Sequence, residues 1–331
     1  MNTSVTPEIR DLRLYTAAQL RPLLDAENHL WLERLNWDYM SSTRLLLEYL
    51  DARALPGFVA VEHGEIIGYV FCVYEANKGV IGNVFAAPQP SGQSAHSDTI
   101  RRELQRILLE QAIALLTHSP GIDRVETQLL LHEAREHADA LEAAGFRRVE
   151  RLYMLRELHE SGFSPQHPPV TGGCLLRQWR DADMATAAQL IVSAYHDHPD
   201  SRINDQYQTP QGAQRFLHNI VRYPGCGTFV PEASFVAADA LTGTMAGMVL
   251  SSRISTFCGH ITQICVAPQF RRRGLAEQLL RVATQALTAY GLTRLTLTVT
   301  AANQSAIRLY LREKFYEHRR FDAAVWTRHG F

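Results

Sequence analysis

The sequence predicts an α/β (α+β) protein of two tandem domains, each with a mixed, largely antiparallel sheet flanked by helices. Three observations support this fold class. A chain of 331 residues exceeds the usual length of one domain. Its two halves resemble one another in sequence. Strand-like segments and amphipathic helical segments also follow one another in a similar order in both halves, and that order is typical of a mixed sheet.

The internal repeat consists of five segments that recur in the same order. They are LRLYTAAQL from Leu12 and LRQWRDADM from Leu176, FVAVEHGEIIGYV from Phe58 and FVAADALTGTMAGMV from Phe235, APQ from Ala87 and from Ala267, GIDRVETQL from Gly121 and GLTRLTLTV from Gly291, and GFRRVERL from Gly145 and KFYEHRRF from Lys314. The Pro/Gly/His-rich stretch 158–173 is typical of a linker. We therefore expect domains at 1–157 and 174–331.

The second half allows its elements to be placed in order. Alternating and β-branched stretches predict strands, and apolar residues at helical spacing predict helices. The expected strands are 175–179, 234–238, 247–254, 260–266, 294–300 and a final one around 316–326, and the expected helices are 183–195, 211–221, 274–290 and 303–313.

Composition excludes several classes of protein. The chain carries 33 basic and 34 acidic side chains, a balance that argues against bulk binding to nucleic acid or to an anionic membrane. Its five cysteines lack CxxC spacing, so we expect reduced thiols, no disulfide framework and no metal. No apolar stretch is long enough to span a bilayer and no signal peptide is visible, which predicts a cytoplasmic protein.

The segment QFRRRGLAEQLL contains the first chemical motif. A strand is expected to end at Val266, and a helix is expected to open at Gly274 after Arg271, Arg272 and Arg273. Unpaired N–H groups and the positive dipole end make a helix N-terminus an anion site. Gly274 and the small Ala276 leave room for a phosphate. The alternative is a solvated arginine run before an ordinary helix.

A second motif follows one strand later. Asn303 begins a helix with the pattern N-x-x-A-x-x-x-Y, in which Ala306 and Tyr310 are the other fixed positions. Asn303 is also a good helix N-cap, and Tyr310 is also suited to a core. Taken together, Arg271-x-x-Gly274-x-Ala276 and the Asn/Tyr helix resemble the GNAT superfamily of coenzyme-A-dependent acyltransferases over about 155 residues.

This resemblance implies a site and a mechanism. Acetyl-CoA or another acyl-CoA would be the co-substrate, and an amine of a small molecule or a peptide would attack its thioester directly. Tyr310 would protonate the leaving thiolate. His260 occupies the place where histone-type members carry a general-base Glu, although it also suits a strand start beside Gly259. The residues implied to bind the acyl-CoA are Ile264, Cys265, Val266, Arg271, Arg272, Arg273, Gly274, Leu275, Ala276, Asn303 and Ala306.

The first half lacks these motifs. Pro90–Thr99 replaces the arginine loop, and the positions that match Asn303 and Tyr310 are Ala134 and Leu141. We therefore expect 1–157 to be a degenerate, non-catalytic copy. The layout resembles tandem GNAT proteins such as the mycothiol synthase family.

The acceptor side is expected at Tyr195–Pro210, which joins two helices that border the acceptor pocket in GNAT folds. His196, Asp197, Arg202 and Asn204 are the candidate acceptor-binding residues, and a solvated loop is the alternative. Two other functions remain open at this point. The first is a non-catalytic acyl-CoA-binding or regulatory module. The second is an enzyme that performs other chemistry on acyl-CoA.

Overall fold

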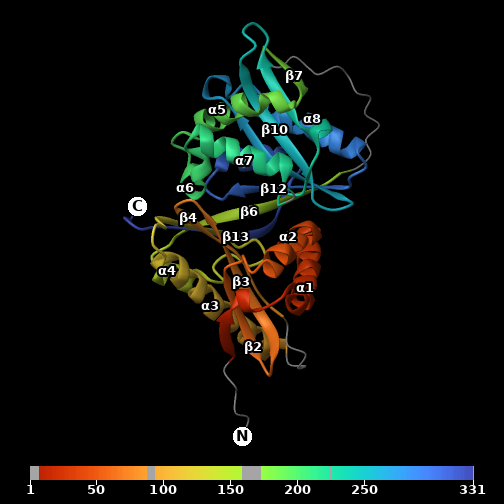
Figure 1. The fold of residues 1–331 in the computed structure, drawn as a ribbon. Coiled ribbons are helices and arrows are strands. Elements are labelled where there is room, and N and C mark those ends of the chain that lie inside the picture. The colour runs from red at the N-terminus through yellow and green to blue at the C-terminus, as the bar shows by residue number, and fades with distance from the viewer. Residues whose placement is uncertain (1–6, 88–93, 159–172, 224, 331) are drawn as a thin grey trace. The chain divides into compact units, whose positions relative to one another are not determined.

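The computed structural model describes residues 7–87, 94–158, 173–223 and 225–330 (Figure 1). Contacts divide the chain into two compact units. The first comprises Met1–Glu150 and Phe321–Phe331, and the second comprises Arg151–Arg320.

The first unit contains one sheet covered by helices. Its strands are β1 (Glu8–Asp11), β2 (Gly57–Glu62), β3 (Glu65–Glu75), β4 (Lys78–Ala86), β5 (Arg124–Gln128) and the end of β13 (Tyr316–Thr327), and its helices are α1 (Ala17–Leu35), α2 (Met40–Asp51), α3 (Ser94–His118) and α4 (Ala138–Ala143). The strands pair in the order β1-β2-β3-β4-β5-β13, and β4 with β5 is the parallel pair.

Alternation along β3 fills a core on each face of this sheet. Val70 and Cys72 pack in a cluster with side chains of α3, whereas Tyr69 and Phe71 pack in another with side chains of α1 and α2. Successive side chains of a strand point to opposite faces, so α3 covers one face and α1 with α2 covers the other.

The second unit repeats this plan. Its strands are the end of β6 (Arg147–Glu157), β7 (Cys174–Gln178), β8 (Thr228–Phe229), β9 (Phe235–Asp239), β10 (Met245–Arg253), β11 (Cys258–Val266) and β12 (Arg294–Thr300), and its helices are α5 (Met184–Tyr195), α6 (Asp200–Ile203), α7 (Pro210–Arg222), α8 (Leu275–Ala289) and α9 (Gln304–Arg312). The sheet order is β6-β12-β11-β10-β9-β7, β8 pairs with β10, and β11 with β12 is the parallel pair.

These elements confirm the predicted fold class, and the predicted helices and strands of the second half agree with the observed ones to within a few residues. The apolar face predicted for 274–290 is buried in α8, where Leu279, Leu280, Ala283 and Leu287 are inaccessible to solvent. Burial of such a face provides most of the stability of a helix in a folded protein.

The last strand of each repeat belongs to the sheet of the other unit. Residues 151–157 of β6 pair with β12, from Arg151↔Thr300 to Glu157↔Arg294. Residues 323–327 of β13 pair with β5, from Ala323↔Gln128 to Thr327↔Arg124. The chain therefore passes between units within β6 and again within β13, whereas the sequence placed the division at 158–173. Of that stretch, residues 159–172 lie outside the described residues.

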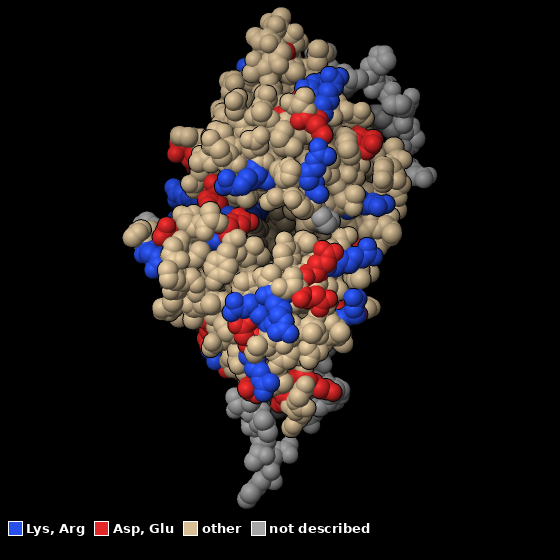
Figure 2. Space-filling model, viewed as in Figure 1, with Lys and Arg blue, Asp and Glu red and all other residues tan. Residues whose placement is uncertain are grey.

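None of the helices in the described part of the chain is long and apolar enough to cross a membrane. On the face seen in Figure 2, basic and acidic side chains are interspersed over a surface that is mostly neither.

Candidate active site

The parallel pairing of β11 and β12 ends halfway along the two strands. It runs from Cys258↔Arg294 to Ile261↔Leu297. Beyond this point β11 continues to Val266 beside β10, and β12 continues to Thr300 beside β6. The two strands therefore diverge and leave an opening in the sheet.

Backbone N–H groups of β11 face this opening. Ala267 N, just after β11, donates to Ala246 O on β10 at 2.8 Å. Because consecutive N–H groups of a strand point to opposite edges, those of Ile264 and Val266 point away from β10, toward the edge that β12 has left.

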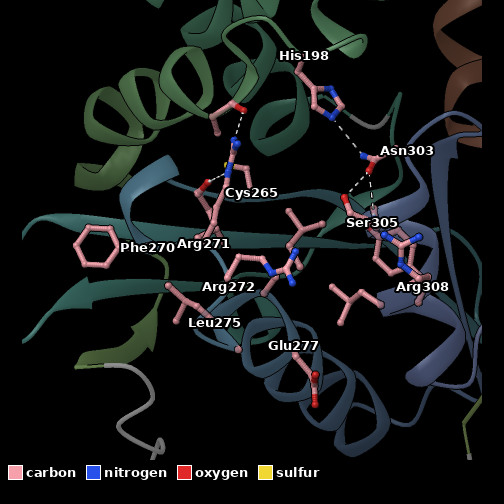
Figure 3. A pocket seen from close by; sticks show the side chains of 18 of the residues that line it. His198, Cys265, Phe270, Arg271, Arg272, Leu275, Glu277, Asn303, Ser305 and Arg308 are labelled. Carbon is pink, nitrogen blue, oxygen red and sulfur yellow. Dashed lines mark hydrogen bonds between the residues drawn. The ribbon is translucent and has the colours of Figure 1, made fainter.

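A pocket of about 610 Å³ lies beside the opening (Figure 3). It is lined by four parts of the second unit: the end of α5 with the residues that follow it, the end of β11, the loop and first turn of α8, and one side of α9. Of the predicted residues, those in the lining are Ile264, Cys265, Val266, Arg271, Arg272, Gly274, Leu275, Ala276, Asn303, Ala306 and Tyr310.

The N-terminus of α8 faces the pocket. Gly274 occupies the N-cap position with a φ of 77°, a left-handed conformation that glycine adopts without steric cost. Among the described residues, no side chain caps this helix. Its first-turn N–H groups are therefore available to an anion at the positive end of a helix of 15 residues.

The three consecutive arginines do not act as one cluster. The Arg271 guanidinium donates to Ala194 O at 2.6 Å and to Val266 O at 3.3 Å, so it ties the loop to α5 and β11. Arg272 lines the pocket, whereas Arg273 stacks on the Phe270 ring at 5.3 Å and is absent from the lining.

The positive charge that sequence reasoning missed comes from α9. Arg308 and Arg312 both line the pocket, and Arg312 also approaches Glu277 at 3.5 Å. Their four-residue spacing places them on one side of the helix with Ser305, a helical periodicity that the sequence contained.

Asn303 fulfils the N-cap role and also contacts the pocket. Its Oδ1 accepts from Ala306 N at 3.2 Å and from Ser305 Oγ at 3.0 Å. Its Nδ2 lies 3.3 Å from His198 Nε2 (Figure 3). The side chain therefore fixes the start of α9 and links it to the α5–α6 loop.

Tyr310 is buried, with 6% of its surface exposed, and its ring lies 6.0 Å from that of Phe315. Burial raises the pKa of Tyr310 above its ordinary value, and the charge of Asp200 adds to the shift. The phenol therefore keeps its proton at neutral pH and is a hydrogen-bond donor beside the pocket.

His260 is placed elsewhere. It is buried between β10 and β12, its Nδ1 lies 2.9 Å from Thr296 Oγ1, and its ring stacks on Tyr153 at 6.2 Å between centroids. Burial, assisted by the charge of Arg151, lowers the pKa of His260 to about 3. The structure thus brings Tyr310 into the pocket and leaves His260 out of its lining.

The four predicted acceptor residues lie outside the lining as well. His196 and Asp197 pair at 2.8 Å on the surface, with side chains 76% and 88% exposed. Arg202 is exposed on α6, and Asn204 caps the next turn by accepting from Gln206 N at 3.0 Å.

Tyr195 and His198 are the residues of this segment that do line the pocket. Their rings meet edge to face at 5.3 Å, and the Asp200 carboxylate lies 3.8 Å from His198 Nδ1 while it accepts from Thr300 Oγ1 at 2.5 Å. Sequence reasoning selected His196 and not His198. The left-handed turn at Asp197, with a φ of 59°, separates their directions.

Residues 190–315 match the model of the acetyltransferase (GNAT) family. The C-terminal half of the chain belongs to this family. The match covers the opening, the α8 loop and α9, so the pocket is that of a GNAT domain. Among curated proteins, none matches the sequence.

The whole chain is similar in fold to solved GNAT proteins. A GCN5-related N-acetyltransferase from Sphaerobacter thermophilus superposes with a TM-score of 0.62 at 17% identity, over 97% of this chain and 95% of that one. A tandem GNAT protein from the clavulanic acid biosynthesis pathway gives 0.57 at 15% identity, over 97% and 98%. A GNAT-family acetyltransferase from Colwellia psychrerythraea gives 0.53 at 12% identity, over 97% and 99%. These likenesses show the tandem GNAT fold.

Proposed function

We propose that the C-terminal GNAT domain transfers an acyl group, the acetyl group in the simplest case, from acyl-CoA to an amine. The observation that carries this proposal is the meeting of three features in one pocket. These features are the open edge of β11, the uncapped N-terminus of α8 and the buried phenol of Tyr310.

The open edge of β11 is suited to the acyl and pantetheine part of the substrate. The N–H groups of Ile264 and Val266 would donate to the thioester carbonyl or to a pantetheine amide, as a strand donates to its neighbour. Fixed donors at the carbonyl stabilise the negative charge that develops on its oxygen when an amine attacks.

The N-terminus of α8 is suited to the pyrophosphate. Its N–H groups and dipole favour an anion, and Arg272 and Arg308 add charge from two sides of the pocket. Arg271 contributes indirectly, because its hydrogen bonds to Ala194 O and Val266 O hold the loop that leads into the first turn of α8.

Tyr310 would protonate the departing thiolate. An ordinary thiol has a pKa of about 8.5, well below that of a phenol near 10, so in water the transfer would be unfavourable. Burial opposes charge on both partners, and it raises the basicity of a thiolate as well as the pKa of the phenol. The two affinities for a proton therefore stay comparable within the pocket.

His198 is better placed than His260 to take the proton from the amine. It lines the pocket in which the amine would meet the thioester, whereas His260 lies outside that lining. A buried imidazole with a pKa of about 3 is a weak base, so we assign His260 a structural role in the core.

The first unit is proposed to bind no acyl-CoA. The pairing of β4 with β5 also ends midway, at Ile81↔Thr127, which corresponds to Ile261↔Leu297. There, however, His132 Nε2 donates to Val84 O at 2.9 Å, so a side chain occupies the edge that is open in the second unit.

The proposal is tested by incubating the full chain with acetyl-CoA and a panel of amines, and by searching for products that have gained an acetyl group by mass spectrometry. Tyr310→Phe removes one hydroxyl and keeps the packing against Phe315. We expect kcat to fall about 10²–10⁴-fold with little change in acetyl-CoA affinity. Acetyl-CoA binding without any acetylated product would favour a binding module. Another product of acetyl-CoA would favour different chemistry.

A further inference from the structure

The opening between β4 and β5 of the first unit holds a buried cluster of three potential metal ligands. His132, Glu136 and His137 lie on one turn, and their ligand atoms are within 4.8 Å of one another. Both histidines are 4% exposed, and the Glu136 side chain is 12% exposed. The spacing of the five cysteines had predicted no metal, and these three residues were not considered there.

The distances between the ligand atoms suit a small ion. His137 Nε2 lies 3.0 Å from His132 Nδ1, and Glu136 Oε2 lies 3.6 Å from the same atom. Zinc bonds to nitrogen and oxygen of about 2.0–2.2 Å in a tetrahedral site place neighbouring ligands about 3.3–3.5 Å apart. The observed separations lie on either side of that value, so small side-chain movements suffice.

The surroundings of the cluster are those of a fixed ligand set. The other ring nitrogen of His132, Nε2, donates a hydrogen bond to Val84 O. Metal-binding histidines are commonly oriented by a hydrogen bond of this kind to a backbone carbonyl. Glu136 Oε2 accepts from Glu133 N at 3.0 Å. The turn itself is held to β13, because the Asp322 carboxylate accepts from Arg135 N at 2.7 Å.

The charges around the cluster are mixed. Arg102 approaches the Glu136 carboxylate at 4.0 Å, whereas the buried Glu27 carboxyl interacts electrostatically with His132. One carboxylate and two neutral imidazoles would leave a divalent ion with a net positive charge.

We propose that His132 Nδ1, Glu136 Oε2 and His137 Nε2 bind one divalent transition-metal ion, Zn²⁺ being the best fit, with a water as the fourth ligand. The ion replaces the proton that otherwise bridges the two rings. It locks the turn that fills the opening of the first unit. This role is independent of acyl transfer in the second unit.

The test uses the full chain, stripped with a chelator and dialysed against Zn²⁺ or Co²⁺. We expect about one ion per chain, a visible Co²⁺ spectrum of nitrogen and oxygen ligation, and a folding equilibrium shifted about 100-fold when free Zn²⁺ is 100 times its Kd. His137→Gln keeps a donor to His132 Nδ1 and removes a ligand, so affinity should fall at least 10–100-fold. Metal-free stability should change little. His29→Gln, on the exposed side of α1, is the matched control.

Two results would overturn the proposal. One is the absence of stoichiometric metal in the wild-type chain, which would leave a network held by protons alone. The other is equal affinity in wild type and His137→Gln, which would place the ion elsewhere. If His137→Gln does not fold, X-ray absorption of the Zn²⁺-loaded wild type decides, because two imidazoles and no sulfur must appear around the ion.

Discussion

Replacing His260 by Asn should reduce the decrease in the free energy of unfolding that we expect in mild acid. The Thr296 hydroxyl donates to Gly259 O at 3.1 Å, so it accepts from His260 Nδ1, 2.9 Å away. Asn can supply the same donor from its Nδ2 and does not titrate. His260→Asn therefore removes the ionisation while it retains the hydrogen bond to β12.

The sign and size of this stability change follow from the pKa of His260, which burial lowers to about 3. An unfolded histidine has a pKa of about 6.5, so between these values the unfolded chain binds more protons than the folded one. Stability must then fall as pH falls through this window. From about pH 7 to about pH 5, the proton linkage of this one group amounts to about 2 kcal/mol.

The assay is urea unfolding of the full chain at about pH 7 and about pH 5, followed by tryptophan fluorescence, which includes the buried Trp179 of the second unit. The wild type should lose about 2 kcal/mol more than His260→Asn between the two values. The exposed His196, replaced by Asn, should behave like wild type. Equal losses in wild type and His260→Asn would refute the argument. His260 would then titrate near its ordinary pKa and would again be eligible as a base.

Three further predictions concern the second unit. Gly274→Glu should abolish acetyl-CoA binding, measured by calorimetry, because it adds negative charge at the N-terminus of α8. Gly274→Ala should keep a weakened site, since it shares the strain of a left-handed residue without the charge. His198→Gln should lower kcat about 10²-fold near neutral pH, whereas His196→Gln should leave it unchanged. The fragment 174–331 should be poorly soluble and weakly active, because it lacks the β6 residues that pair with β12, and adding 151–173 should restore solubility, measured as soluble yield.

Local chemistry made much of the second unit predictable. The spacing of apolar residues placed α8, and the β-branched run placed β12 from Arg294 to Thr300. Gly274 was recognised because a glycine lets an anion approach the backbone, and Asn303 because few residues suit a helix N-cap. Such features depend on a few neighbouring residues, so the sequence alone indicates them.

The exchange of the last strands could not be predicted in the same way. GFRRVERL and KFYEHRRF end the two repeats as if each strand closed its own sheet. A strand of alternating residues pairs equally well with either of two similar sheets, so its partner depends on the whole chain.

The separate directions of the three arginines and of His196 and His198 depend on backbone angles that sequence reasoning did not include. Arg272 has a φ of 63° and Asp197 a φ of 59°, in the left-handed region that non-glycine residues rarely adopt. Such a residue changes the local direction of the chain and redirects the side chains on either side of it. The three consecutive arginines, and likewise the two nearby histidines, therefore lie in different surroundings.

The two openings also explain why the missing motifs of the first half are only part of its difference from the second. A phosphate loop and a tyrosine added to the first unit would still meet His132 at Val84 O, whereas in the second unit the pairing of β11 with β12 has ended before Ile264. Removing His132 alone would leave that carbonyl and His137 without their partner in a buried site, at a cost of about 1–3 kcal/mol for each unsatisfied group. Recovery of acyl-CoA binding in the first unit therefore requires the whole turn 132–137 to change together with the loop.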